Sequence, residues 1–203
     1  MTMSKSTGAM WPWLALVLAT AGPALADEKH ARELIEERCA LCHGMEGETA
    51  SPVYPRLAGQ HPRYIAKQLQ DFRTGRRFGE TMNEMSKDLQ DDEIEILSRF
   101  FAARPAGHRA PADEDLAAVG RYVYLKGNPY SGVAACSSCH GEQGHGNEKM
   151  PRLAGQHPSY LDTQLREFSR RERTNDNAVM QAIAAKLTEL ERKAVASYLG
   201  GLR

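Results

Sequence analysis

The chain has 203 residues, of which 41% are hydrophobic, and it carries 26 basic and 26 acidic side chains with a mean hydropathy of −0.53. These values fit a globular protein and exclude a polytopic membrane protein. The net charge of zero argues against a general nucleic-acid binder, which needs a basic excess, so we expect no nucleic-acid partner.

The first 26 residues have the features of a secretory signal peptide. Lys5 supplies a positive charge, Trp11–Ala21 forms a short apolar run, and Ala24-Leu25-Ala26 is a small-residue cleavage site. The apolar run is shorter than the roughly 20 residues that cross a bilayer, so cleavage is favoured over an uncleaved membrane anchor. We therefore expect a mature chain that begins at Asp27 in the periplasm. The sequence leaves open whether the mature protein also associates loosely with the membrane surface.

One short pattern, Cys-x-x-Cys-His, occurs twice, as Cys39/Cys42/His43 and as Cys136/Cys139/His140. It is the attachment signature of c-type haem, because two thiols form thioethers with the haem vinyl groups and the adjacent histidine then lies beneath the iron. The alternatives are a thioredoxin-like pair, one zinc site or two disulfides. None of them explains a histidine directly after both pairs. The sequence therefore predicts two covalently bound haem c groups.

A long internal repeat surrounds these motifs. Pro55–Pro62 recurs without change as Pro151–Pro158, 96 residues later, and the likeness continues through Tyr64/Tyr160, Gln68/Gln164 and Phe72/Phe168. A repeat of this length indicates duplication. We expect two tandem domains, 27–104 and 113–203, joined by a linker at 105–112 that is rich in proline and alanine.

Helical patterns fill both halves. Helices are expected over Asp27–Arg38 and Asp113–Leu125, and again from Pro62 and Pro158, because proline suits the first turn of a helix. Apolar residues recur at i, i+4 and i+7 after each of these prolines, as Ile65, Leu69 and Phe72 and as Leu161, Leu165 and Phe168. No alternating strand pattern is seen. The fold class is therefore all-α, with two tandem domains, each expected to hold one covalently bound haem.

The sequence pattern also predicts the last helix of each half. Its apolar positions are Ile94, Leu97 and Phe101 in the first half and Val195, Tyr198 and Leu199 in the second. Thr188 and Glu191 form a capping box at the start of the second of these helices. Gly120 is unfavourable within a helix, and a close crossing of two helices would explain it.

Each haem iron with one histidine needs a second ligand or an open site. Met82 and Met85 precede the last helix of the first half, and Met180 holds the same place in the second, all three in expected loops. Met85 is favoured because it stands closer to the last helix, with Met82 as the alternative. We expect His61 and His157 to have a structural role at helix entries.

The two CxxCHG segments, the two PRLAGQHPxY blocks and the RTND…M…AAKL…SYLGGL ending make the chain resemble the dihaem class I cytochromes c, most closely the cytochrome c4 family. The resemblance implies two tandem cytochrome c-like domains with neighbouring haems, each iron bound by His and Met, and it favours Met85. It also implies that the carbonyls of Pro55 and Pro151 accept hydrogen bonds from His43 and His140. The implied partners are redox proteins, namely a membrane-bound donor complex and a terminal oxidase.

These features predict an electron carrier, not an enzyme. The alternative is a dihaem electron-accepting subunit of a flavocytochrome or dehydrogenase complex. A dihaem peroxidase needs an iron with an accessible position. That class is disfavoured because each half has its own candidate methionine and the mature chain is short.

Overall fold

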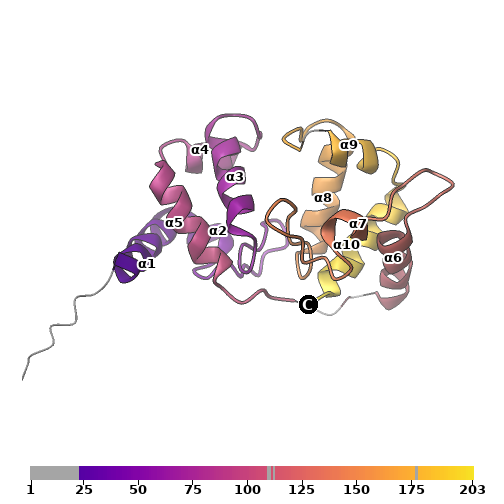
Figure 1. Ribbon diagram of the computed structural model, residues 1–203, viewed down its shortest axis with the longest axis horizontal. Helices are drawn as coiled ribbons and strands as arrows, with labels where there is room; N and C mark the ends of the chain where they lie inside the picture. The colour runs from indigo at the N-terminus through magenta and orange to yellow at the C-terminus, as the bar shows by residue number, and fades with distance from the viewer. Residues whose placement is uncertain (1–22, 109–110, 112, 177) are drawn as a thin grey trace, which may run out of the picture.

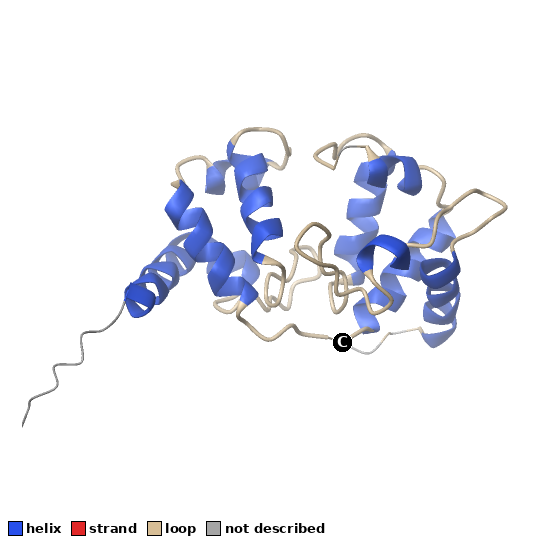
Figure 2. Ribbon diagram, viewed as in Figure 1, coloured by secondary structure: helices blue, strands red, loops and turns tan. Residues whose placement is uncertain are grey.

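The computed structural model describes residues 23–108, 111, 113–176 and 178–203. In those residues the chain forms helices and loops without a strand (Figure 2), so the predicted all-α fold is confirmed. The helices form two lobes that follow each other along the chain (Figure 1). The predicted signal segment lies mostly outside the described residues, and its cleavage and the domain boundaries stay predictions.

The first lobe is built from six helical segments. They are α1 (Pro23–Leu34), a π-helical turn (Ile35–Cys39), α2 (Ala40–His43), α3 (Pro62–Arg73), α4 (Glu80–Ser86) and α5 (Asp91–Ala102). The helix expected over Asp27–Arg38 thus begins earlier and changes to a π-helical turn before the first haem motif. Such turns occur frequently at functional sites.

The second lobe repeats this order with five helices. They are α6 (Glu114–Lys126), α7 (Ser137–His140), α8 (Pro158–Ser169), α9 (Val179–Ala184) and α10 (Glu189–Gly201). Asp113 caps α6 by accepting a hydrogen bond from the backbone N–H of Leu116. A loop absent from the first lobe joins α6 to α7, and the backbones of Asn128 and Val133 pair across it.

Each lobe has its own hydrophobic core. The first gathers Ala31, Leu34, Ile35, Ile65, Leu89, Ile94, Leu97, Phe100 and Phe101, and the second gathers Val123, Tyr124, Val133, Leu161, Val195, Ala196 and Leu199. The apolar stripes predicted from helical spacing supply four residues of the first set, Ile65, Ile94, Leu97 and Phe101, and three of the second, Leu161, Val195 and Leu199. The predicted close crossing is also present, because a Cβ on Gly120 of α6 would lie 1.9 Å from the carbonyl oxygen of Ala194 in α10.

The repeated PRLAGQHP blocks join the two lobes. The amide of Gln60 donates to the carbonyl of Arg152 at 2.9 Å and accepts from its N–H at 2.8 Å. Gln156 makes the same pair of bonds with Arg56, both at 2.9 Å. The two glutamines hold equivalent positions in the repeat. The polar contacts between the two lobes therefore have approximate twofold symmetry.

The two histidines before the helix-starting prolines take part in this interface. His61 Nε2 donates to the carbonyl of His145 at 2.8 Å, and His157 Nε2 donates to the carbonyl of Thr49 at 3.0 Å. Neither side chain caps its own helix. Their role is structural, as expected, but it joins the two lobes instead of fixing a helix entry.

Candidate haem sites

The two candidate histidines have matching surroundings. His43 ends α2 and its Nδ1 donates to the carbonyl of Pro55 at 3.0 Å, while His140 ends α7 and its Nδ1 donates to the carbonyl of Pro151 at 3.2 Å. Both rings are buried. Each ring therefore has Nδ1 occupied and Nε2 left for a metal, with its orientation set by the backbone.

The protonation state of both rings suits a ligand. Burial lowers the pKa of His43 and of His140, and the hydrogen bond to the proline carbonyl only partly opposes this effect. Because iron binds the neutral imidazole, the site keeps each ring in the form that it needs. The same carbonyl fixes the proton on Nδ1 and so selects the tautomer.

Cys39 and Cys136 lie one helical turn before the histidines, at the N-caps of α2 and α7, and Cys42 and Cys139 directly precede the histidines within those helices. None forms a disulfide, and the first of each pair, Cys39 and Cys136, packs against the core of its own lobe. Burial raises the pKa of these two thiols to about 11. Within the described residues, no three His, Cys, Asp or Glu side chains gather as a metal site. The four cysteines therefore do not gather into a zinc site in the described part of the chain.

Two tyrosines that the sequence reasoning did not single out lie beside the haem motifs. Tyr124 is fully buried, and its hydroxyl donates to the carbonyl of Gly141, next to His140, at 2.6 Å. In the first lobe, Tyr54 meets the His43 ring edge-on with the centroids 6.1 Å apart. The repeat has Met150 in place of Tyr54, so the two sites differ on the histidine side.

The candidate methionines lie on short helices, not in loops. Met82 and Met85 are on α4, and Met180 is on α9. Asn83 stabilises α4 because its Oδ1 accepts from the N–H of Gly79 and its Nδ2 donates to the carbonyl of Phe72. Helix α4 is thereby fixed to the end of α3.

The structural register of the two lobes separates Met82 from Met85. Capping boxes start α5 at Gln90 and α10 at Thr188, 98 residues apart. At the same separation, the fully buried Ser86 matches Ala184, with exposures of 0% and 2%. Met82 then matches Met180, whereas Met85, which is 36% exposed, matches a position occupied by isoleucine. The register therefore favours Met82, the alternative that the sequence left open.

Two family models and several known proteins match this chain over most of its length. Residues 125–203 match the cytochrome c family model, and residues 26–101 match the model of cytochrome c oxidase, cbb3-type, subunit III. The chain is 41% identical to cytochrome c4 of Thiocapsa roseopersicina over 90% of this chain and 96% of that protein. It is also 34% identical to a thiosulfate dehydrogenase electron acceptor of Thiomonas intermedia, over 79% of this chain and 76% of that protein.

A solved structure shows the same architecture. The crystal structure of reduced recombinant cytochrome c4 from Pseudomonas stutzeri superposes with a TM-score of 0.81 at 34% identity, covering 90% of this chain and all of that one. Two cytochrome c domains and these relatives indicate two covalently bound haem c groups. When bound, each supplies an iron that cycles between Fe(III) and Fe(II). The chain belongs to the cytochrome c4 family of dihaem electron carriers.

Proposed function

We propose that this protein is a periplasmic electron carrier that takes electrons from a membrane-bound donor complex and passes them to a terminal oxidase. In this proposal residues 1–26 are removed on export, and residues 27–104 and 113–203 each carry one haem. No helix of the described part is long and apolar enough to cross a membrane. The observation that carries the proposal is the repeated buried histidine, bonded through Nδ1 to a proline carbonyl beside two free thiols.

The proposed covalent attachment uses Cys39 and Cys42 in the first domain and Cys136 and Cys139 in the second. His43 and His140 are the proposed axial nitrogen ligands. Their partners are Met82 and Met180, and this choice replaces Met85 because of the register of α4 and α9. A His/Met pair raises the reduction potential of a haem relative to a pair of histidine ligands, because thioether sulfur favours Fe(II).

The axial assignment is tested on purified holoprotein with Met82→Ala, Met85→Ala and Met180→Ala. We expect two haems per chain in the wild type. Met82→Ala and Met180→Ala each remove the sulfur-ligated signal of one haem, and Met85→Ala, the matched control three residues along the same helix, leaves both. The measurement is a reduced-minus-oxidised spectrum with haem quantitation. Loss of the signal in Met85→Ala with Met82→Ala unchanged would restore the first choice of ligand.

A second function is favoured by the names of two relatives. The Thiomonas intermedia protein is named as the electron acceptor of thiosulfate dehydrogenase, which corresponds to the alternative of an accepting subunit in a dehydrogenase complex. Both functions use the same two haem sites and differ in the donor. Copurification with a catalytic subunit, and fast reduction of this protein by that subunit, would select the second.

A further inference from the structure

The residues that hold the two methionine-bearing helices in place differ between the domains. In the register that aligns Met82 with Met180, Asn83 of α4 corresponds to Gln181 of α9. In the same register, Asp176 corresponds to Phe78. The side chains of Asn83 and Asp176 form hydrogen bonds beside a proposed ligand, whereas Gln181 makes no side-chain hydrogen bond to another described residue and phenylalanine cannot make one. Each domain therefore lacks the polar residue that the other one uses.

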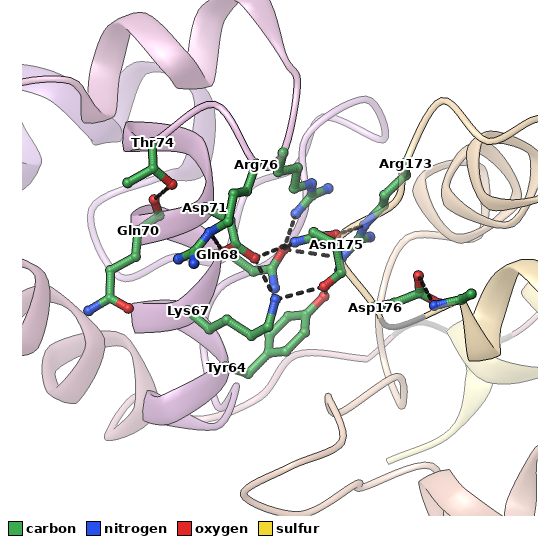
Figure 3. Close-up of polar contacts among 12 residues, drawn as sticks. Tyr64, Lys67, Gln68, Gln70, Asp71, Thr74, Arg76, Arg173, Asn175 and Asp176 are labelled. Atoms are coloured by element: carbon green, nitrogen blue, oxygen red, sulfur yellow. Dashed lines mark hydrogen bonds and ion pairs between the residues drawn. The ribbon is translucent and has the colours of Figure 1, made fainter.

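In the second domain, the carboxylate of Asp176 binds the backbone at the start of α9. One oxygen accepts from the N–H of Met180 at 2.6 Å, and the other accepts from the N–H of Ala178 at 3.2 Å. The first N–H groups of a helix have no partner within the helix, and negative charge is favourable at this end. In Figure 3, Asp176 lies apart from the contacts that Asn175 makes with the first lobe. The bonds of Asp176 therefore act on the segment that carries the proposed ligand.

The backbone just before Met180 is strained. Ala178 has a φ of 65°, in the left-handed region that residues other than glycine rarely adopt. Such a conformation costs free energy and persists only where the surrounding structure holds it. The hydrogen bond from the N–H of Ala178 to Asp176 is one such restraint. Loss of the Asp176 carboxylate would therefore let this turn relax and shift the start of α9.

In the first domain, the amide of Asn83 joins α4 to the segment that precedes it. Its Nδ2 donates to the carbonyl of Phe72 in α3 at 2.5 Å and to the carbonyl of Arg77 at 3.0 Å. Its Oδ1 accepts from the N–H of Gly79 at 2.8 Å. All three bonds lie within the first domain. Because Asn83 directly follows Met82, they fix the backbone that carries the proposed ligand.

A methionine ligand depends on the chain that presents it. Outer residues that orient a ligand contribute to how well it binds its metal. A small molecule from solution can occupy the methionine's position on the iron only while the methionine is displaced by a local opening of the chain. The apparent affinity for that molecule is the intrinsic affinity multiplied by the fraction of protein in the open state. Residues that hold the methionine-bearing helix therefore lower the affinity for an external ligand.

We propose that Asp176 and Asn83 are positioning residues for the two methionine ligands, each acting on the iron of its own domain alone. The carboxylate holds Met180 through its backbone N–H, and the amide holds Met82 by tying α4 to α3. Together they keep both irons closed to small molecules in solution. The inference rests on the proposed function, because it requires both haems and the choice of Met82. It goes beyond that function by assigning the control of ligand release to residues that are not ligands and that differ chemically between the domains.

The test is a titration of ferric holoprotein with imidazole, applied to wild type, Asp176→Ala, Asp176→Asn and Asn83→Ala. We expect imidazole to bind the second domain about tenfold more tightly in Asp176→Ala, the typical effect of losing one hydrogen bond to a charged group. Asn83→Ala should tighten binding in the first domain only. Asp176→Asn should lie between Asp176→Ala and wild type, because one oxygen acceptor remains. Nuclear magnetic resonance of methyl-labelled methionine shows which ligand leaves, with Met82→Ala and Met180→Ala as references.

Two controls separate positioning from general stability. Asp113→Ala removes a carboxylate that accepts from the N–H of Leu116 at the start of α6, a helix without a proposed ligand. Gln181→Ala truncates the residue equivalent to Asn83. Both controls should bind imidazole as wild type does. The proposal is wrong if Asp113→Ala matches Asp176→Ala, if either test variant changes both domains equally, or if neither changes its own domain.

A measurement on the unaltered protein covers variants that fail to fold. Hydrogen exchange at the N–H of Met180 should be slow in the ferric holoprotein and faster once imidazole saturates the second domain, because α9 must shift for the ligand to leave. Exchange that is unaffected by imidazole would overturn the role of Asp176. Haem quantitation separates the two levels of inference. A chain without haem ends the proposed function, whereas two sulfur-ligated haems with unchanged imidazole affinities in Asp176→Ala and Asn83→Ala end only this inference.

Discussion

Gly120 shows how a single residue reports on packing. Propensity alone marks glycine as a poor choice in a helix interior, at a cost of about 1 kcal/mol relative to alanine. In the structure, the space for a Cβ is already taken by the backbone of α10, since Ala194 O would lie 1.9 Å away. Glycine is therefore required at this position, despite its low helix propensity, because any Cβ would clash with the backbone of α10.

Gly120→Ala is therefore expected to destabilise the second domain, although alanine is the better helix former. Overpacking of this kind typically costs about 1–3 kcal/mol, and we expect a net loss of about 2 kcal/mol in the free energy of unfolding. Denaturant unfolding followed by circular dichroism measures it. Ala118→Gly on the exposed face of the same helix is the control and should cost about 1 kcal/mol from propensity alone. Equal stability of Gly120→Ala and wild type would refute the steric argument.

At the scale of elements, the capping boxes fix where the last helix of each domain begins. Thr188 accepts from the N–H of Glu191 at 3.2 Å, and the Glu191 carboxylate accepts from the N–H of Thr188 at 2.8 Å. Gln90 and Glu93 start α5 in the same way. The Thr188–Glu191 box was predicted from the sequence. The Gln90–Glu93 box was not, because glutamine is an unusual capping residue. Together the two boxes define the 98-residue register in which Met82 matches Met180.

Thr188→Ala tests the contribution of the cap. Loss of a threonine cap typically costs about 1 kcal/mol, and α10 packs on both α6 and α8, so the second domain should lose this amount of stability. Thermal unfolding of the holoprotein measures the change. The matched control is Thr163→Ala within α8, at a position without a capping role. If the two variants melt together below wild type, the cap is not the cause.

At the scale of the whole molecule, polar contacts between the lobes include a buried acid. Asp71 is 2% exposed, and its carboxylate accepts from Asn175 of the other lobe at 2.6 Å. Burial raises the pKa of Asp71, but the hydrogen bonds from Lys67 and Asn175 and the charges of Lys67 and Arg76 outweigh this effect, so the pKa is lowered overall. Its ionised form therefore stabilises the folded pair of domains.

Because the folded pKa of Asp71 is depressed, its stabilisation is fully present above the unfolded carboxyl pKa of about 3.9 and is lost as the pH falls through the folded value. We expect Asp71→Asn to cost about 2 kcal/mol near neutral pH. The difference from wild type should shrink below about pH 4. Urea unfolding across pH measures it, with exposed Asp88→Asn as the control. A difference that stays constant down to the lowest pH would exclude the ionised carboxylate as the cause.

The sequence by itself determined the haem chemistry, the duplication and the helical stripes. These features depend on residues within one or two turns of each other, as in the five residues Cys39–His43, or on the exact recurrence of Pro55–Pro62. Such short-range patterns are nearly independent of how distant segments pack. The predicted fold class therefore agrees with the structure, and the two predicted haem groups agree with the relatives of this chain.

Tertiary structure decided which residues separated by about 100 positions meet. Only packing brings Arg77 and Arg173 to the same acceptor, Gln164, and turns His157 toward Thr49. A side chain's partner in the other lobe depends on the relative placement of two cores, which no local pattern encodes. Identical polar residues in both repeats were the one signal of this interface in the sequence.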